Sequence, residues 1–253
     1  MRFRVIDIET SGGSPSEIIE IAAVDVVARL GGWTAEPPRI QRYKPVGAIS
    51  FHAMAIHHLT PAELADAPLC THAALAAFLD KGPAADILVA HNAAFEARHI
   101  PADVSGARPW LCTVKAARCA WPDAPGYANQ VLRYWRNLDL APDLAMPAHR
   151  AGPDAWVTAH LLIDLLKSAS VERLMAWNRD EPDPMQVPFG KHRGKAWSET
   201  PIDYLQWLTA QADMSDTVRT LALAELARRN ATCPRSNPQP TSPAPGACRS
   251  GLA

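Results

Sequence analysis

The sequence contains no apolar run as long as a membrane-spanning helix requires. Its first ten residues include Asp7 and Glu9, where a secretory leader needs an uninterrupted apolar stretch. We therefore expect a cytoplasmic protein with no membrane partner. Of the 253 residues, 48% are apolar and 20% are charged, which excludes a wholly disordered chain and suits one or two globular domains.

Closely spaced cysteines and an excess of positive charge are also lacking. No Cys-x-x-Cys pair occurs, which argues against a disulfide framework and a thiolate zinc site, and we expect reduced thiols. The 25 basic and 26 acidic residues give a formal net charge of −1, which excludes a histone-like polycation. The net charge is still compatible with a local patch of basic residues. The five cysteines are spread along the chain: Cys70, Cys112, Cys119, Cys233 and Cys248.

Segments rich in β-branched side chains predict the strands of a sheet. Two of them, 2–10 and 17–27, are separated by turn residues and favour a hairpin. A third strand near 40–45 would complete an antiparallel meander. Short apolar runs at 87–90 and 110–113 alternate with helical segments, which is typical of buried parallel strands. The sequence thus predicts an α/β fold with a mixed five-stranded sheet flanked by helices.

Apolar residues at helical spacing predict the flanking helices. The clearest helix covers 152–169, where Asp154 shares one stripe with Leu161 and Leu165 and therefore faces inward. Shorter helical patterns occupy 61–67, 73–80 and 128–138.

Prolines and acidic residues over 180–185 interrupt the helical pattern and predict a linker. It would separate an N-terminal domain, 1–179, from a small basic α+β module, 186–230. Residues 231–253 are rich in Pro, Ser and Gly and nearly lack large apolar side chains, so we expect a disordered tail. Within the module we expect a short strand leading into the basic run 189–195, then helices over 201–211 and 215–230.

Two carboxylates two residues apart stand near the end of the first predicted strand. Asp7 and Glu9 should point to the same face, about 7 Å apart along the strand. Such a pair is usually a solvated strand face. Here the apolar neighbours Val5, Ile6 and Ile8 indicate a buried strand, and buried carboxylates need a cation or hydrogen-bond donors.

Further acidic residues and a histidine lie at strand exits and helix starts. Glu96 follows the 87–90 strand in the first turns of a helix, where a plain alternative is a glutamate that complements the helix dipole. His149 stands on a loop before Asp154, and this spacing is also compatible with an ordinary capping aspartate. Together the four carboxylates offer the hard oxygen ligands that Mg²⁺ and Mn²⁺ prefer.

The order Asp-x-Glu, His-Asn-x-x-Phe-Glu and His-x4-Asp resembles the DEDDh branch of the 3′→5′ exonucleases, which have a ribonuclease-H-like fold. The resemblance covers roughly residues 1–168 and continues into 189–195 and 204–208. The chain departs from the family's pattern at Glu96, where aspartate is usual, and at Gly13, where many members have an apolar residue.

The resemblance implies a role for each of these side chains. Asp7 would bridge two Mg²⁺ ions, for which Mn²⁺ could substitute, Glu9 and Asp154 would complete one site, and Glu96 would serve the other. His149 would take the proton from the attacking water. The implied reaction is hydrolysis of DNA phosphodiesters to nucleoside 5′-monophosphates, at single-stranded or frayed 3′ ends, in DNA repair or end processing.

The resemblance also implies substrate contacts near the terminal nucleotide. The resemblance makes the loop 54–60 a candidate for contact with the terminal sugar and base. The plain alternative is that Met54 and Ile56 of this loop pack inward. The basic run has two interpretations: Lys191, Arg193 and Lys195 contact phosphate groups, or they belong to an ordinary solvated surface loop. The candidate contacts to the terminal sugar and base are Thr10, Met54, Ile56, His57, His91, Asn92 and Phe95.

Two other functions stay open at this point. The same chemistry on short RNA would define an exoribonuclease, because nothing in the motifs reads the 2′-hydroxyl. A catalytically silent nucleic-acid-binding or polymerase accessory module is the second alternative, and Glu96 is the feature in its favour. The oligomeric state is not predicted.

Overall fold

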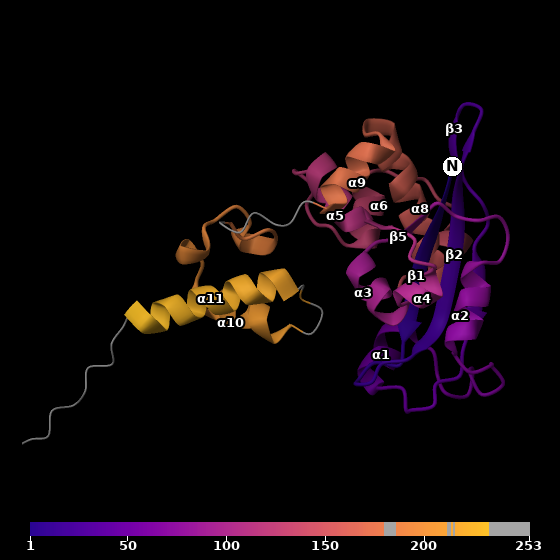
Figure 1. Cartoon of the computed structure of the whole chain (residues 1–253), viewed down its shortest axis with the longest axis horizontal. Coiled ribbons are helices and arrows are strands. Elements are labelled where there is room, and N and C mark those ends of the chain that lie inside the picture. Colours follow the sequence, from indigo (N-terminus) through magenta and orange to yellow (C-terminus); the bar gives the residue numbers. More distant parts are fainter. Residues whose placement is uncertain (180–185, 212–213, 215, 233–253) are drawn as a thin grey trace, which may run out of the picture. The chain divides into compact units, whose positions relative to one another are not determined.

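The computed structural model describes residues 1–179, 186–211, 214 and 216–232 (Figure 1). The chain divides into two compact units, Met1–Glu181 and Pro182–Ala253, which we describe separately. The predicted linker 180–185 lies outside the described residues, as do residues 233–253 of the predicted tail 231–253. The start predicted for the tail was wrong, because Ala231 and Thr232 are the last residues of the helix Asp216–Thr232. In the described part, no helix is long and apolar enough to cross a membrane.

The first unit is built on a mixed sheet with the strand order β3-β2-β1-β5-β6, to which β4 is added by pairing with β2. β1 and β2 form the predicted antiparallel hairpin, and β5 and β6 extend the sheet in parallel. These predictions are confirmed. The strands are β1 Arg2–Thr10, β2 Ile18–Arg29, β3 Gly32–Ala35, β4 Arg39–Arg42, β5 Ile87–Ala90 and β6 Trp110–Cys112.

The prediction of five strands was wrong, because the sheet has six. β2 is 12 residues long and pairs with β3 near its end and with β4 near its start. Pro37 and Pro38 stand between these two short strands, and prolines cannot donate to a ladder, so the edge is interrupted there. No strand was predicted over 32–35, where β3 has only four residues.

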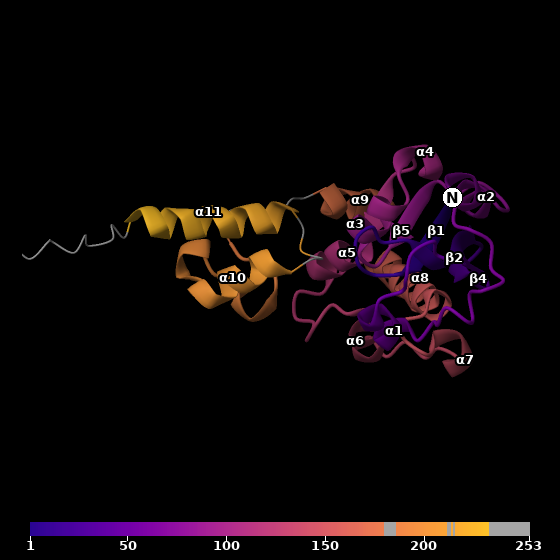
Figure 2. The same ribbon diagram turned by 90° about the horizontal axis from the view of Figure 1, so that it is seen from below.

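Helices cover both faces of the sheet, with α2 and α4 on one side and α6, α7 and α8 on the other (Figure 2). The helices predicted over 73–80, 128–138 and 152–169 are confirmed as α2, α6 and α8. The helices of this unit are α1 Phe51–His57, α2 His72–Leu79, α3 Ala93–His99, α4 Ala102–Ser105, α5 Thr113–Ala120, α6 Asn129–Trp135, α7 Pro142–Ala145, α8 Ala151–Ser168 and α9 Val171–Arg179.

Two predictions about the segment between β4 and α2 were wrong. The helix expected over 61–67 is a run of turns, because its backbone bonds join residues three apart. The loop expected over 54–60 instead contains most of α1. Ser50 caps this helix by accepting the N–H of Ala53 at 3.1 Å, and His58 ends it in a left-handed conformation.

Alternation along β1 and β2 assigns their side chains to the two helical layers. Phe3 and Val5 on β1 and Val24 on β2 belong to the hydrophobic cluster that contains α8. Ile6 and Ile8 lie in a second cluster with α2 and α4. Because the period of a strand is two, odd-numbered β1 residues and even-numbered β2 residues face α8.

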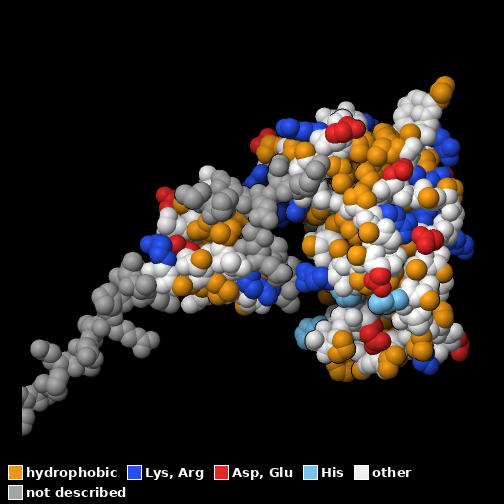
Figure 3. All heavy atoms as spheres, viewed as in Figure 1, with side chains coloured by type: hydrophobic (Ala, Val, Ile, Leu, Met, Phe, Trp, Pro, Cys, Tyr) orange, Lys and Arg blue, Asp and Glu red, His pale blue; other side chains and the backbone are white. Residues whose placement is uncertain are grey.

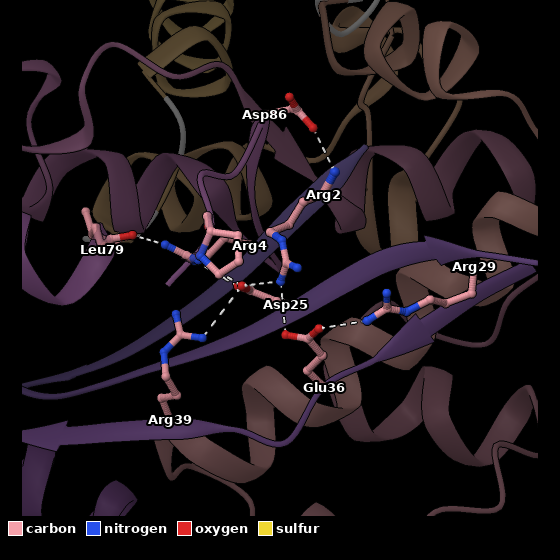
Figure 4. Close-up of polar contacts among 9 residues, drawn as sticks. Arg2, Arg4, Asp25, Arg29, Glu36, Arg39, Leu79 and Asp86 are labelled. Atoms are coloured by element: carbon pink, nitrogen blue, oxygen red, sulfur yellow. Dashed lines mark hydrogen bonds and ion pairs between the residues drawn. The ribbon is translucent and has the colours of Figure 1, made fainter. Parts of the chain in front are cut away.

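A buried ion pair joins β1 to β2 on the side of α2 (Figure 4). The side chains of Arg4 and Asp25 are fully buried, and two N–H groups of the guanidinium donate to the carboxylate oxygens at 2.8 Å. Arg4 also donates to the carbonyl oxygens of Leu79, at the end of α2, and Pro83. The pair therefore fixes the end of α2 to the sheet.

The second unit is small and mainly helical. The two helices predicted there are confirmed as α10 Ile202–Ala210 and α11 Asp216–Thr232. The expected strand before Phe189 was wrong: the described residues show only an isolated bridge between Gln186 and Ala196, and 3-10 turns follow at Gly190–His192 (η1) and Trp197–Glu199 (η2). The core of this unit consists of Val187, Trp197, Tyr204, Leu205, Leu208, Met214, Val218 and Ala222.

Candidate metal centre and active site

Three carboxylates converge where β1 meets the start of α8. Asp7 and Glu9 lie in phase with Phe3 and Val5, so their side chains face α8, and Asp154 lies in the first turn of that helix. One carboxylate oxygen from each of the three residues lies within 4.8 Å of the other two. The structure thus brings together three of the predicted metal ligands.

The electrostatics of this cluster favour a cation. Burial, followed by the charges of Asp154 and Glu9, raises the pKa of Asp7 well above its usual range. Burial and the charge of Asp154 raise the pKa of Glu9 to about 8, and burial raises that of Asp154. Like charges in a buried site repel one another, and a divalent cation would offset both the repulsion and the desolvation.

Glu96 provides a fourth carboxylate, on α3 directly after β5. Its side chain is buried, 4% exposed, and burial raises its pKa to about 8. One of its oxygens, Oε2, has no hydrogen-bond partner among the described residues. The charge of Glu96 is among those that raise the pKa of Asp7, but Glu96 is not part of the group whose oxygens lie within 4.8 Å of one another. A buried carboxylate oxygen without a donor fits a metal ligand.

His149 is exposed on the loop that leads into α8. Its backbone has φ of 61°, a left-handed conformation that a residue with a side chain adopts only under constraint. The constraint is a hydrogen bond, in which the His149 N–H donates to Oδ2 of Asp154 at 2.9 Å. The loop is thus bonded to the carboxylate cluster while the imidazole stays accessible to solvent.

Glu20 and Arg150, which the sequence did not single out, hold the loop of His149 in place. Glu20 lies opposite Glu9 in the β1–β2 register and is buried, 1% exposed. Its carboxylate accepts two N–H groups of Arg150, at 2.6 and 3.1 Å, and the N–H of Ala151 at 3.0 Å. Burial alone would raise the pKa of Glu20, but its bonds to Arg150 lower it, so Glu20 stays charged. A lone glutamate within an apolar strand was the available signal.

Two of the predicted substrate contacts are histidines held by the protein. The Nε2 atom of His91 is 2.7 Å from the carbonyl oxygen of Tyr127, and Nδ1 is 2.8 Å from the hydroxyl of Thr113. Burial lowers the pKa of His91 to about 4, which keeps the ring neutral. His57 is buried and accepts the N–H of Leu59 at 2.9 Å, and burial lowers its pKa. Each ring therefore holds a main-chain group: His91 the carbonyl of Tyr127 and His57 the N–H of Leu59.

The other predicted contacts differ in exposure. Met54 packs on the cluster of Ile19, Ile49, Leu59 and Leu64, whereas Ile56 is 51% exposed. Inward packing therefore holds for Met54 alone. Thr10 and Phe95 are half-buried, and Asn92 is exposed before α3; in the second unit, Lys191, Arg193 and Lys195 are exposed.

The chain, with this sheet and with carboxylates supplied by β1, α3 and α8, belongs to the exonuclease family. The model of that family, described as "Exonuclease", matches residues 5–162. The chain is 36% identical to Exodeoxyribonuclease 10 of Escherichia coli strain K12 over 222 residues, which covers 85% of this chain and 94% of that protein.

Solved structures confirm the ribonuclease-H-like fold. The structure of exonuclease X in complex with 5′ overhanging duplex DNA is 33% identical, with a TM-score of 0.57, and covers 70% of this chain and 99% of its own. The nuclease domain of 3′hExo, a DEDDh family member bound to rAMP, has a TM-score of 0.51 at 13% identity and covers 66% of this chain and 92% of its own, a likeness of fold.

Proposed function

We propose that this exonuclease is a divalent-metal-dependent enzyme that removes nucleoside 5′-monophosphates from the 3′ ends of DNA. The observation that carries the proposal is the convergence of Asp7, Glu9 and Asp154 oxygens within 4.8 Å of one another. The similarity to Exodeoxyribonuclease 10 over most of both chains supports DNA as the substrate.

Asp7, Glu9, Asp154 and Glu96 would hold the metal ions. The donor set is all oxygen, which suits Mg²⁺ or Mn²⁺ rather than zinc. Two such ions would supply the positive charge that stabilises the reacting phosphate and would lower the pKa of the attacking water. The raised pKa values of the carboxyls and the unpartnered oxygen of Glu96 support this assignment.

His149 would act as the general base. Its imidazole is exposed, and its backbone N–H donates to Asp154, so the residue lies at the edge of the carboxylate cluster. An imidazole at this edge can take a proton from the attacking water. The ion pair of Glu20 and Arg150 holds the loop from which the ring projects.

The terminal nucleotide would lie over the end of β1 and the helices α1 and α3. Ile56, Asn92 and Thr10 are accessible for contact there. His91 and His57 would position backbone, since both ring nitrogens of His91 and the Nδ1 atom of His57 have protein partners. On the face of the described residues that Figure 3 shows, basic and acidic side chains are interspersed, so the grip on DNA would come from a few contacts. Exposed Lys191, Arg193 and Lys195 would add phosphate contacts.

Digestion of matched DNA and RNA oligonucleotides with and without Mg²⁺ tests the proposal. We expect Mg²⁺-dependent release of deoxynucleoside 5′-monophosphates and much slower digestion of RNA, and the Asp7→Asn variant should be inactive. Faster digestion of RNA would establish the exoribonuclease alternative. Binding of DNA without hydrolysis under any divalent metal would establish the silent module. An activity on DNA ends would fit a role in repair or end processing.

A further inference from the structure

The second unit contains an open pocket of about 370 Å³ that the exonuclease site does not use. It is lined by Lys191 from η1 and by Asp203, Tyr204 and Trp207 from α10. The volume falls in the range of about 300–1,000 Å³ that is common for small-ligand sites. All four residues belong to this unit, so the pocket is complete within it.

One wall of the pocket is a pair of stacked aromatic rings. The rings of Tyr204 and Trp207 lie 5.3 Å apart between centroids, with 24° between their planes. Tyr204 is buried and packs edge-on against His192, whereas Trp207 is 48% exposed. An exposed indole backed by a buried ring is a rigid, flat surface on which another ring can stack.

The polar groups of the pocket select the kind of ligand. The ammonium of Lys191 lies 5.5 Å from the centre of the Tyr204 ring. Asp203 accepts the N–H of Tyr204 through Oδ1 at 2.8 Å, and its negative charge disfavours a bare anion inside the pocket. A ligand that combines a flat ring with a neighbouring negative group can stack on the aromatic wall and place the negative group at Lys191. A nucleotide unit has this composition.

The loop that carries Lys191 has a fixed shape. Gly190 has φ of +73°, and a Cβ atom there would collide with the Tyr204 hydroxyl, so this close approach requires glycine. The N–H of Val187 donates to the carbonyl of Lys195 at 2.8 Å, and the N–H of Gly194 donates back to Val187 at 2.9 Å. Lys191 is thus held beside the aromatic wall before any ligand arrives.

We propose that this pocket binds one unpaired nucleotide of single-stranded DNA, with its base stacked on Trp207 and a phosphate at Lys191. The inference rests on the proposed function, because DNA is the single-stranded ligand that the enzyme would meet. Stacking on an aromatic face tolerates every base, which suits an enzyme that must hold strands of any sequence. The unit would retain DNA independently of the metal site.

The test is fluorescence anisotropy of the full chain with a short labelled oligothymidylate in EDTA, where the metal site is inactive. Trp207→Leu should raise the Kd by about 5- to 150-fold, the range that corresponds to stacking of one base. Trp207→Phe should stay within a few-fold of the wild type. Ile202→Ala is the matched control, because Ile202 is also 48% exposed on α10 and does not line the pocket.

A second ligand separates stacking from phosphate contact. An oligonucleotide of equal length in which abasic sites replace the bases keeps every phosphate, and the wild type should bind it as weakly as Trp207→Leu binds oligothymidylate. Equal Kd values of folded Trp207→Leu and wild-type protein for oligothymidylate would overturn the proposal. If the Leu variant does not fold, Lys191→Gln decides: its slope of log affinity against log salt should be shallower by about 0.7, and an unchanged slope would overturn the proposal.

Hydrolysis of the same oligonucleotide by the wild type with Mg²⁺ keeps this test distinct from that of the proposed function. Trp207-dependent binding without hydrolysis would reject the exonuclease proposal and support the pocket. Normal hydrolysis with binding that does not depend on Trp207 would reject the pocket alone.

Discussion

The guanidinium of Arg150 lies 2.6 Å from the carboxylate of Glu20, across the gap between β2 and the start of α8. This ion pair connects the loop of His149 to β2, on which Glu20 lies opposite Glu9 of β1. Neither residue is proposed to bind metal, although their charges act on Glu9 and the carbonyl of Arg150 accepts the N–H of Asp154, so the pair would contribute to turnover by holding the loop and by balancing the charge of the carboxylates. The pair also holds the first turn of α8, because Glu20 accepts the N–H of Ala151.

We predict that Arg150→Met lowers kcat at least 10-fold with little change in KM, because the loop of His149 loses its anchor while the carboxylates remain. Arg150→Lys should retain more activity than Met, since it keeps a charge for Glu20. The matched control is Arg29→Met, which breaks the exposed pair of Arg29 and Glu36 and should change neither rate nor stability measurably. A kcat for Arg150→Met equal to that of the wild type would contradict the positioning role.

We predict that the metal-free protein becomes less stable as the pH rises from about 5 to about 8. The folded pKa values of Glu9 and Glu96, about 8, exceed their unfolded values, so stabilisation by bound protons is lost as the pH rises through the folded pKa. Mg²⁺ should restore stability at the higher pH. Thermal unfolding in EDTA and in Mg²⁺ at both pH values measures the effect.

Asp7→Asn should remove part of this loss, because it deletes one of the repelling charges. The exposed Asp66→Asn serves as its control and should follow the wild type. Parallel pH profiles of the wild type and Asp7→Asn in EDTA would show that the carboxylates do not repel one another as described.

We predict that Glu96→Asp keeps or raises activity, since aspartate is the usual ligand in the family that the chain resembles. Glu96→Gln should be severely impaired, because an amide cannot supply the charge that faces a metal ion. Turnover across a Mg²⁺ titration measures both variants. Equal curves for the Gln variant and the wild type would remove Glu96 from the site.

We predict that Asp25→Asn lowers the free energy of unfolding by about 3–5 kcal/mol, because Arg4 would be left charged and buried. Denaturant unfolding measures this loss. Activity per folded molecule should stay normal, since the pair lies on the side of the sheet that faces α2. A stability within about 1 kcal/mol of the wild type would mean that water or another group replaces the carboxylate.

Local patterns of residue type and periodicity in the sequence were sufficient to predict much of this fold and of the candidate site. The β-branched hairpin and the two short apolar runs predicted β1, β2, β5 and β6, and the alternation of β1 placed Asp7 and Glu9 on one face. The stripe of Asp154 and Leu161 predicted the inward face of α8. These features depend on neighbours in sequence, and periodicity reports them directly.

The features that were missed depend on distant partners. β3 is four residues long and exists because β2 extends far enough to pair with it. The α1 helix depends on the cap at Ser50, and its seven residues are too few for periodicity to show. Glu20 and Arg150 are 130 residues apart, so no local pattern could connect them.

Digestion of a 5′-labelled single-stranded DNA oligonucleotide with Mg²⁺, followed in time on a denaturing gel, tests directly whether the protein is a metal-dependent 3′→5′ exonuclease. We expect a ladder of progressively shorter labelled products and free nucleoside 5′-monophosphates, no digestion in EDTA or by Asp7→Asn, and resistance of an oligonucleotide with a blocked 3′ end. Immediate release of the labelled terminal nucleotide, or an Asp7→Asn variant as active as the wild type, would contradict the proposed function.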